Sequence, residues 1–487
     1  MSAAAMLAPD VLAELARRGV GVSRLCVDSR RVTAGDVFVA APGAQADGRR
    51  FIGEALARGA AAVLYEAAGA PPLPATAVPL LPVAGLAGQL GQIADLVYQR
   101  PSAQLCLIGV TGTNGKTSVT HFIAQALAAL VRPCALIGTL GNGFPDALDP
   151  SPNTTPDAIT LHAALARYLA QGARACAMEV SSIGLEQGRV AGARFAVAVL
   201  TNLTRDHLEY HGTMEAYAAS KRLLFETPGL GAAVLNLDDP FGQELAQRLR
   251  GRMRTIGYTL GAAGGADEVL AASDLDLRSG LAFRVNGQPA HASLVGRFNV
   301  ANLLAALGAL QAAGIALEQA LTTLPRLRPP AGRMEAQGGS GQPLVVVDYA
   351  HSPDALEQAL TTLRETARER GGRLVCLFGC GGDRDPGKRP LMGAVAERLA
   401  DRVVLTSDNP RGEEPGAIVA AIRAGMAGEP ETELNRGRAI HSTVARADTR
   451  DVILVAGKGH EPYQEIGGVR HPYSDLEQVR AALEQRT

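Results

Sequence analysis

Short apolar runs alternate with helix-like stretches over most of the chain, and this alternation restricts the fold more than any other feature. In the last third, the runs are LVVVDYA, RLVCLFG, RVVLTS and DVILVAG, with helical sequence between and after them. Further upstream, QLCLIGV, ACAMEV, FAVAVLTNL and GAAVLNLD repeat the arrangement. Strands that alternate with helices predict mostly parallel α/β sheets, whose ligand sites lie at the carboxyl ends of the strands.

Two boundaries divide the chain, one at Arg100-Pro101 and one at LRPPAGR, residues 327–333. At 487 residues the chain is too long for a single core, and about three domains are expected. We predict domains at 1–98, 99–328 and 329–487. The central one has a P-loop ATPase-like, mostly parallel sheet, and the last has a Rossmann-like doubly wound sheet. Residues 259–295, rich in Gly and Ala, predict a β-hairpin.

Charge and composition narrow the class of partner. The formal net charge is −1, which gives no global field for nucleic acid or a membrane surface. No apolar run approaches 18 residues, so no membrane span is expected. The first 19 residues carry Asp10 and Glu14 and predict an amphipathic helix rather than a signal peptide. Six cysteines without a CxxC pair indicate reduced thiols of a cytoplasmic protein.

The stretch GVTGTNGKTSVT, residues 109–120, follows an apolar strand and precedes an apolar helix. This context aims backbone N–H groups and a helix N-terminus at an anion. Lys116 would neutralise β- and γ-phosphates, and the Thr117 hydroxyl could bind Mg²⁺. Val110 stands where the usual pattern has its first glycine, so a plain glycine turn is the alternative. We predict phosphate binding.

TGTNGKTS resembles the shifted phosphate loop of the Mur ligases and folylpolyglutamate synthases. DSR, DGRR, NTTPD, MEVSS, TNLTRDHLEYHG, SKRLLF and SDNPRG occur in the order found in the tripeptide-forming branch of the Mur ligases, and the resemblance covers nearly the whole chain. It implies an ATP-dependent amide-bond ligase of peptidoglycan precursor synthesis that adds meso-2,6-diaminopimelate to UDP-MurNAc-L-Ala-D-Glu through an acyl phosphate. Mg²⁺ is the implied cofactor, ATP the co-substrate, and the partners are these small molecules. We expect a cytoplasmic monomer.

The resemblance also implies the site residues. The catalytic ones are Lys116, Glu179, His207 and Lys221, and the metal ligands are Thr117, Glu179, His207 and Lys221 as its carbamate, N6-carboxylysine. His207 rests on resemblance because hard cations prefer oxygen. The implied ATP contacts are Thr113, Asn114, Gly115, Lys116, Thr117, Ser118, Val119, Asn299, Asn302 and Arg333, with Asp348 and His351 on the nucleotide side. The implied contacts to the UDP-MurNAc-dipeptide are Val27, Ser29, Ala44, Gln45, Ala46, Asn153, Thr154, Thr155, Ser181, Gln187 and Arg189. Ala44 replaces a histidine of the family pattern.

The added amino acid is the sharpest inference. Diaminopimelate has a second zwitterionic end, which needs a guanidinium fork for its carboxylate and an acid for its ammonium group. Loops after three strands supply such groups and should meet at one sheet edge. They carry Arg384, then Asp408, Asn409, Pro410 and Arg411, and then Gly457 and Glu461. DNPR resembles the diaminopimelate signature, and lysine-adding relatives lack its arginine. The alternative is that Arg411 only pairs with Glu413 or Glu414 at the surface.

Three other functions stay open on the sequence. A lysine-adding ligase would share the fold and mechanism and differ at Arg411 and Arg384. A folylpolyglutamate synthase would not need the DSR and DGRR stretches. A nucleotide-binding scaffold without turnover would not need Lys116, Glu179, His207 and Lys221 together.

Overall fold

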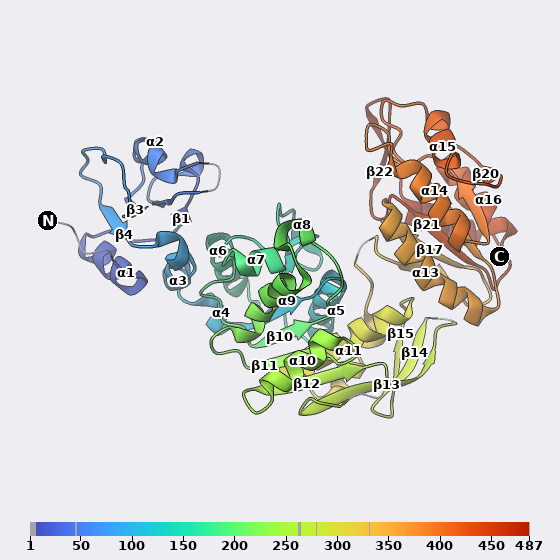
Figure 1. Ribbon diagram of the computed structural model, residues 1–487, viewed down its shortest axis with the longest axis horizontal. Helices are drawn as coiled ribbons and strands as arrows, with labels where there is room; N and C mark the ends of the chain where they lie inside the picture. The colour runs from blue at the N-terminus through green and yellow to red at the C-terminus, as the bar shows by residue number, and fades with distance from the viewer. Residues whose placement is uncertain (1–5, 44–45, 262–263, 279, 331, 487) are drawn as a thin grey trace. The chain divides into compact units, whose positions relative to one another are not determined.

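The computed structural model describes residues 6–43, 46–261, 264–278, 280–330 and 332–486, which fall into two compact units. The first unit comprises Met1–Tyr258, Gly264–Val269 and Ala305–Ile315, and the second comprises Thr259–Ala263, Leu270–Leu304 and Ala316–Thr487. The chain changes unit within strand β13 (Glu268–Asp276) and within helix α11 (Arg297–Ala312), both labelled in Figure 1.

The first unit begins with a four-stranded parallel sheet in the order β1-β2-β3-β4. Its strands are β1 (Leu25–Cys26), β2 (Val37–Ala40), β3 (Ala62–Glu66) and β4 (Leu80–Val83). Its helices are α1 (Ala8–Arg17), η1 (Ser29–Arg31), η2 (Gly48–Phe51), α2 (Ile52–Ala57) and α3 (Leu86–Val97). The run LCVDS predicts a longer first strand. Instead, the Asp28 carboxylate accepts a hydrogen bond from the N–H of Arg30 (3.0 Å) and starts the 3₁₀ turn η1.

Side chains that alternate along β2 pack on opposite faces of this sheet. Val37 belongs to a buried cluster with Leu15 of α1, whereas Phe38 belongs to a cluster with Ile52 of α2. This is the period-2 packing expected of a strand that is covered on both sides.

The central sheet of the first unit has the order β12-β11-β10-β5-β9-β6-β7-β8. It is parallel from β12 to β6, and β7 and β8 add an antiparallel end. The strands are β5 (Cys106–Thr111), β6 (Cys134–Gly138), β7 (Gly141–Phe144), β8 (Ala147–Asp149), β9 (Ala175–Glu179), β10 (Val197–Leu200), β11 (Ala232–Asn236) and β12 (Arg254–Thr259). The helices are α4 (Pro101–Gln104), α5 (Lys116–Ala129), α6 (Ala158–Ala170), α7 (Ser182–Glu186), α8 (Leu208–His211), α9 (Met214–Arg222), η3 (Leu223–Glu226) and α10 (Pro240–Leu249).

The region expected to form one hairpin contains three strands. β13 pairs antiparallel with β14 (Leu281–Val285), which pairs antiparallel with β15 (Gln288–Ala292). Helix α11, α12 (Leu317–Leu321) and η4 (Leu324–Arg326) follow. The hairpin prediction was therefore one strand short, because Gly and Ala carry little strand signal of their own.

The C-terminal sheet of the second unit has the order β16-β17-β21-β18-β19-β20 and is parallel except for β16. Its strands are β16 (Glu335–Gly338), β17 (Leu344–Asp348), β18 (Leu374–Phe378), β19 (Arg402–Leu405), β20 (Glu431–Thr432) and β21 (Val452–Ala456), and β22 (Tyr463–Ile466) and β23 (Val469–Pro472) form a separate hairpin. The helices are α13 (Pro353–Arg370), α14 (Lys388–Leu399), α15 (Pro415–Arg423), α16 (Arg436–Arg446) and α17 (Asp475–Glu484).

This sheet is covered by helices on both faces. Val346 packs with Leu360 of α13 in one buried cluster, and its neighbour Val345 packs with Ile440 of α16 in another. Together with the strand order, this is the doubly wound arrangement predicted from the sequence. The α/β class with mostly parallel sheets is thus confirmed.

Two further expectations concern the whole chain. All six cysteines are free; five are buried and Cys106 is partly buried. Among the described residues, no helix has the length and apolar character needed to cross a membrane.

Candidate active site

The loop between β5 and α5 has the backbone of a phosphate-binding loop. Gly112 has a φ of +146°, and a Cβ at this position would lie 1.8 Å from the Thr201 hydroxyl, so only glycine fits. Gly115 has a φ of +85° and directly precedes the first residue of α5. The partially positive N-terminus of α5 therefore lies at the loop, where it favours an anion.

Lys116 lies against the loop. Its Nζ donates hydrogen bonds to the carbonyl oxygens of Gly112 (2.9 Å) and Thr113 (2.8 Å). Burial lowers the pKa of Lys116, and the carboxylates of Glu179 and Asp206 act in the opposite direction. The ammonium group is thus held at the position where a phosphate would bind.

The other predicted residues of the loop differ in how far their side chains are exposed to solvent. Asn114 is exposed, and Ser118 is partly exposed in the first turn of α5. Val119 is fully buried and its N–H donates to the Gly115 carbonyl (2.9 Å), so it shapes the helix start. The Asn202 side chain, which the sequence did not single out, accepts a hydrogen bond from the Asn114 N–H (2.9 Å).

Glu179 ends β9 and connects to the start of α5. Its side chain is buried, and its Oε2 accepts a hydrogen bond from Thr117 Oγ1 (3.0 Å). Thr139, another residue that the sequence did not single out, donates its N–H to Oε1 (2.8 Å) and its hydroxyl to Oε2 (3.2 Å). The structure thus brings the two predicted oxygen ligands, Thr117 and Glu179, into contact.

Lys221 reaches the same loop from α9. The residue is 1% exposed, and its Nζ donates to the Gly112 carbonyl (2.8 Å). Burial first, and then the Lys116 cation, lower the pKa of Lys221 to about 6, although the Asp206 carboxylate acts in the opposite direction. Lys116 and Lys221 therefore share one carbonyl oxygen. A pKa of about 6 leaves Lys221 largely neutral at neutral pH.

Tyr217 links these groups, although it was not among the residues predicted from the sequence. Its ring centroid lies 4.3 Å from Lys221 Nζ, and its hydroxyl lies 3.2 Å from Thr113 Oγ1. The ring also meets the His207 ring edge-on, at 6.2 Å between centroids. Tyr217 lies four residues before Lys221, a helical spacing that could have flagged it.

His207 is the predicted catalytic residue with the most open surroundings. Its side chain is 44% exposed, and its nitrogens lie 3.5 Å from Asp206 Oδ2 and 3.5 Å from Glu209 Oε1. Within the described ranges, no three His, Cys, Asp or Glu side chains group closely enough to hold a metal ion. The oxygen pair of Thr117 and Glu179 suits Mg²⁺, whereas His207 remains a prediction from resemblance.

Residues predicted to contact the muramoyl-dipeptide form a network that starts at Glu179. Thr155 Oγ1 donates to the Glu179 carbonyl (2.9 Å) and to Ser181 Oγ (3.2 Å), and Thr154 Oγ1 lies 3.0 Å from Thr139 Oγ1. Asn153 is exposed beside them, and the Asn153 carbonyl accepts from the Ser151 hydroxyl (2.8 Å).

Arg189 joins this network through hydrogen bonds from its guanidinium group. Nη1 donates to the Thr155 carbonyl (2.9 Å), while Nε (3.0 Å) and Nη2 (2.7 Å) both donate to Gln187 Oε1. The predicted carboxylate-binding fork is therefore already directed at a neighbouring predicted contact. Arg189 and Gln187 therefore lie in contact, as expected of residues that bind the same substrate.

A cavity of about 400 Å³ in the first unit contains one of the predicted UDP-side residues. Val27, 53% exposed, lines it together with Arg24, Arg31 and Arg167. Ser29 is buried next to this segment and donates its hydroxyl to Glu54 Oε2 (2.7 Å). Ala46 is exposed, and its carbonyl accepts a hydrogen bond from the Gly43 N–H (2.9 Å). Ala44 and Gln45 lie outside the described residues.

The nucleotide-side predictions of the second unit fall into two groups. Asn299 and Asn302 are buried in successive turns of α11, and Asn302 Nδ2 donates to Asn299 Oδ1 (3.1 Å). Asp348, at the end of β17, accepts from the N–H groups of Met334 (2.8 Å) and Ala350 (2.9 Å).

Arg333 and His351 flank one tyrosine. The Arg333 guanidinium lies 6.0 Å from the centre of the Tyr349 ring, and the His351 ring lies 4.6 Å from it. The His351 Nδ1 is 2.8 Å from the Tyr349 carbonyl. These residues therefore lie together at one end of β17.

The three loops predicted to bind diaminopimelate meet at the carboxyl edge of the C-terminal sheet. Asn409 Nδ2 donates to Glu461 Oε2 (2.8 Å), which joins the loop after β19 to the loop after β21. Gly457 has a φ of +116°, and a Cβ there would lie 2.4 Å from Asp408 Oδ2. Burial raises the pKa of Asp408, and the nearby cations of Arg436 and Lys458 oppose this.

Arg411 follows Pro410, which is buried, and has a φ of +50°. Its Nη1 donates to the Gly382 carbonyl (2.7 Å), and its Nε lies 3.7 Å from Glu465 Oε2. The loop after β18 is thus tied to Arg411, and Arg384 lies exposed on that same loop.

The alternative pairing of Arg411 with a following glutamate is not what the structure shows. Glu413 pairs instead with Arg389, at 2.8 Å between Nη2 and Oε1. The Arg411 guanidinium instead contacts the Gly382 carbonyl of the loop after β18 and lies near Glu465.

Lys458 is a further residue of this edge that the sequence analysis missed. It is fully buried and its Nζ donates to Asn409 Oδ1 (2.9 Å) and Glu461 Oε2 (3.0 Å). Its place between Gly457 and Glu461 in GKGHE was visible, but a buried lysine is rare enough that burial could not be assumed. It fixes both predicted side chains.

Comparison with known proteins gives matches along the whole chain. Residues 22–98 match the model of the Mur ligase family catalytic domain, residues 110–310 the Mur ligase middle domain, and residues 332–459 the Mur ligase glutamate ligase domain. A protein of Ectopseudomonas mendocina (strain ymp) is 54% identical over 472 residues, 96% of both chains. A protein of Pseudomonas aeruginosa is 53% identical over 471 residues, again 96% of both.

Both relatives bear the name UDP-N-acetylmuramoyl-L-alanyl-D-glutamate--2,6-diaminopimelate ligase. A solved structure with that name in its title is 40% identical, covers 96% of this chain and 95% of its own, and has a TM-score of 0.76. Matches of this extent and identity, together with the phosphate loop and its surroundings, show that the chain belongs to the Mur ligase family.

Proposed function

We propose that this protein is an ATP-dependent ligase that joins meso-2,6-diaminopimelate to UDP-MurNAc-L-Ala-D-Glu. The observation that carries the proposal is the 54% identity, over 96% of both chains, to a relative with that name. The product would be a peptidoglycan precursor, made by a monomer in the cytoplasm. The arrangement of the two candidate sites agrees with the chemistry that such a reaction requires.

A carboxylate is a poor electrophile, so it must be activated before an amine can attack it. The substrate carboxylate attacks the γ-phosphorus of ATP, which gives an acyl phosphate and releases ADP. The amine then attacks the acyl carbon, and the tetrahedral intermediate collapses to the amide and phosphate. Negative charge is spread over phosphoryl oxygens in the first step, so cationic groups must surround them.

Lys116 and the N-terminus of α5 are the groups placed for that task. A phosphate in the loop would accept the Lys116 hydrogen bonds that now go to Gly112 and Thr113. Asn299, Asn302, Arg333, Asp348 and His351 are proposed to bind the rest of the nucleotide.

Thr117 and Glu179 would hold Mg²⁺, since their oxygen atoms are already in contact and hard cations prefer oxygen. The ion would neutralise the phosphoryl oxygens when bound. His207 and the carbamate of Lys221 are proposed to complete the set.

Lys221 is suited to carbamate formation by its surroundings. CO₂ reacts with a neutral amine, and burial with a neighbouring cation lowers the pKa of Lys221 to about 6. The carbamate would be an anion beside the Lys116 cation, so a neutral amine would be replaced by a group of opposite charge to Lys116. The nitrogen that would carry the carbamate lies at the phosphate loop, since Nζ is 2.8 Å from the Gly112 carbonyl oxygen.

The edge of the C-terminal sheet would bind the far end of diaminopimelate. Arg411 and Arg384 are proposed to face its carboxylate, and Asp408 and Glu461 its ammonium group. Lys458 and Asn409 hold Glu461 in place through bonds of 3.0 and 2.8 Å.

The cavity beside Val27 is proposed to receive the UDP end of the other substrate. Its lining has three arginines and two carboxylates, Asp28 and Asp157, and this excess of positive charge would favour a diphosphate. Thr154, Thr155, Ser181, Gln187 and Arg189 would contact the dipeptide, and their network ends on Glu179.

Phosphate release tests the proposal directly. Purified protein is given ATP, Mg²⁺ and UDP-MurNAc-L-Ala-D-Glu, with either meso-diaminopimelate or L-lysine as the amine. We expect turnover with diaminopimelate and little with lysine. Turnover with lysine alone would keep the mechanism and overturn the assignment of Arg411. Absence of turnover with both would favour a folate-type ligase or a scaffold without activity.

A further inference from the structure

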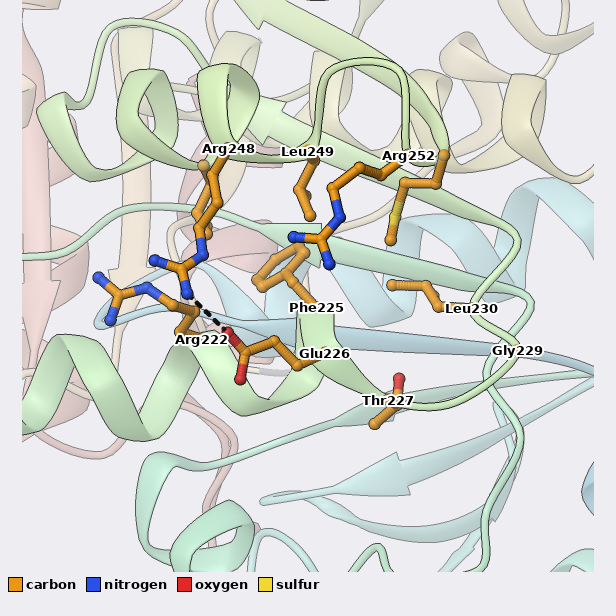
Figure 2. Close-up of a pocket in the computed structure, with 11 residues that line it drawn as sticks. Arg222, Phe225, Glu226, Thr227, Gly229, Leu230, Arg248, Leu249 and Arg252 are labelled. Carbon is orange, nitrogen blue, oxygen red and sulfur yellow. Dashed lines mark hydrogen bonds and ion pairs between the residues drawn. The ribbon is translucent and has the colours of Figure 1, made fainter.

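A second cavity of the first unit, of about 470 Å³, lies between the end of α9 with η3 and the end of α10 (Figure 2). None of the residues that line it belongs to the predicted active site. Its inner wall is apolar: Phe225 is 1% exposed and Leu245 is fully buried. Its volume falls in the range of small-molecule pockets, about 300 to 1,000 Å³.

The polar side chains of this cavity are mostly cationic. Arg222, Arg248 and Arg252 line it with one carboxylate, Glu226, so the lining carries a formal charge of +3 − 1 = +2. The whole chain, by contrast, has a net charge of −1. Charge of one sign in a low-dielectric hollow concentrates the field on a ligand of opposite sign.

The guanidinium groups of the cavity are incompletely paired. Arg248 makes a long ion pair with Glu226 (3.4 Å), and Arg222 pairs with Glu244 (2.7 Å) but keeps a buried Nε without a hydrogen-bond partner. Among the residues that the structure describes, the Arg252 guanidinium has neither a hydrogen bond nor an ion pair. Arg248 and Arg252 are exposed, so the buried donor of the cluster is Arg222 Nε. A buried donor without a partner is costly, which points to a ligand that accepts from Arg222 and that the two exposed guanidinium groups can also reach.

Helix ends explain only part of this cluster. Arg222 and Arg248 lie in the last turns of α9 and α10, where a cation is favoured by the helix dipole. Arg252 lies three residues beyond the end of α10 and has no such role. Figure 2 shows its side chain extending over the space that Phe225 and Leu230 enclose.

We propose that this cavity binds a phosphate-bearing anion through Arg222, Arg248 and Arg252. Planar guanidinium forks match phosphate oxygens, and a net lining charge of +2 suits a dianion better than a single carboxylate. The apolar wall would contact an organic group attached to the phosphate. Inorganic phosphate and an aromatic phosphate ester offer the arginines the same phosphate oxygens. Only the ester has an organic group that could contact the apolar wall.

Binding here would act on the active site through one residue. A phosphate that draws Arg222 from Glu244 moves the residue next to Lys221, at the end of α9. Occupancy would therefore change how Lys221 lies at the phosphate loop. This effect on turnover rests on the proposed ligase function, whereas binding to the cavity does not.

Calorimetric titration of the full chain with inorganic phosphate and with phenyl phosphate tests the site. The Lys116→Ala background reduces binding at the phosphate loop. We expect the double variant Arg248→Ala/Arg252→Ala to bind phenyl phosphate at least about tenfold more weakly, because two charge-assisted contacts are lost. The matched control is Arg250→Ala, an exposed arginine of the same turn that does not line the cavity.

The double variant Arg248→Lys/Arg252→Lys keeps the charge and should retain part of the affinity, which separates a lost contact from a lost fold. Tighter binding of phenyl phosphate than of phosphate would assign the apolar wall to the ligand. Equal affinity in the wild-type, alanine and control proteins, or no binding of either anion at millimolar concentration, would overturn the proposal. A ligase assay without turnover would refute the proposed function and leave this titration unaffected.

Discussion

At Lys221, burial and a neighbouring cation act in the same direction on one amine. Arginine keeps the positive charge but cannot form a carbamate, so Lys221→Arg tests the modification rather than the charge. We expect a loss of about 100-fold or more in kcat, as for removal of a group that stabilises transition-state charge. Phosphate release measures the loss. In a ¹³C NMR spectrum recorded in ¹³C-bicarbonate, the wild type should show a carbamate resonance. Lys221→Arg should lack this resonance, and the control variant Lys388→Arg should retain it. A wild-type spectrum without that resonance would contradict the assignment.

Arg411 is the residue on which amine specificity rests. Arg411→Ala should raise KM for meso-diaminopimelate by about 10- to 100-fold, because a charge-assisted hydrogen bond of about 1.5–3 kcal/mol is lost. KM for ATP should stay nearly unchanged. Arg402→Ala, which removes a surface pair with Glu431, is the control. An equal rise in both KM values would show that Arg411 supports the sheet edge as a whole rather than the amino acid.

The positions of several site residues could be predicted from the sequence, and others could not. Strand ends and helix starts pointed to Lys116 and the residues around Arg411, because parallel strands place their carboxyl ends together, whereas Glu179 was implied by the family resemblance. Thr139 was missed because its partner, Glu179, lies 40 residues along the chain. Tyr217 and Lys458 have partners nearby in the sequence, but their contacts and the burial of Lys458 are not visible in the sequence pattern.

The elements themselves were largely predictable, because a buried strand must be apolar and a covering helix must present an apolar stripe. The first strand was predicted too long. There, a local hydrogen bond to the Asp28 side chain competes with strand pairing, which the apolar pattern does not report. The extra strand among residues 259–295 was hidden by weak strand formers.

The turn that leads into β2 gives a pH-dependent contribution to stability. Asp36 is buried, its Oδ1 accepts from Arg24 Nε (2.8 Å), and its Oδ2 accepts from the Thr33 N–H (2.7 Å). The hydrogen bond from the Arg24 side chain lowers the pKa of Asp36 from 3.8 to about 2. A depressed folded-state pKa stabilises the protein above the unfolded value, and this contribution disappears as the pH falls from about 4 to about 2.

The comparison of wild type with Asp36→Asn measures this contribution. At pH 7 the variant should have a free energy of unfolding about 2 kcal/mol lower, from a shift of nearly two units at 1.36 kcal/mol each. The difference in urea unfolding should shrink as the pH falls below about 4. A difference that stays constant between pH 7 and pH 3 would show that Asp36 acts through its shape rather than its charge. Asp10→Asn, on an exposed helix turn, serves as the control.

On the scale of the whole molecule, the chain has separate hydrophobic cores at its two ends. The N-terminal sheet packs clusters around residues such as Val39 and Phe38, one of which also includes Ile159 of α6, and the C-terminal sheet packs separate clusters around Leu454 and Val455. Sheets with independent cores can unfold separately. Thermal unfolding should therefore resolve a transition that belongs to the C-terminal sheet.

A buried ion pair identifies that transition. Arg436 and Asp475 are both fully buried, with Nε–Oδ1 and Nη2–Oδ2 distances of 2.7 Å. Asp475→Asn leaves the guanidinium buried without its counter-ion, which should cost about 3–5 kcal/mol. In differential scanning calorimetry, the midpoint temperature of the C-terminal transition should fall, while the midpoint temperatures of the other transitions stay unchanged. Asp448→Asn, at an exposed pair with Arg450, should leave the profile nearly unchanged. If Asp475→Asn lowers every transition equally, the two ends unfold as one cooperative body, and the separation of their cores does not govern stability.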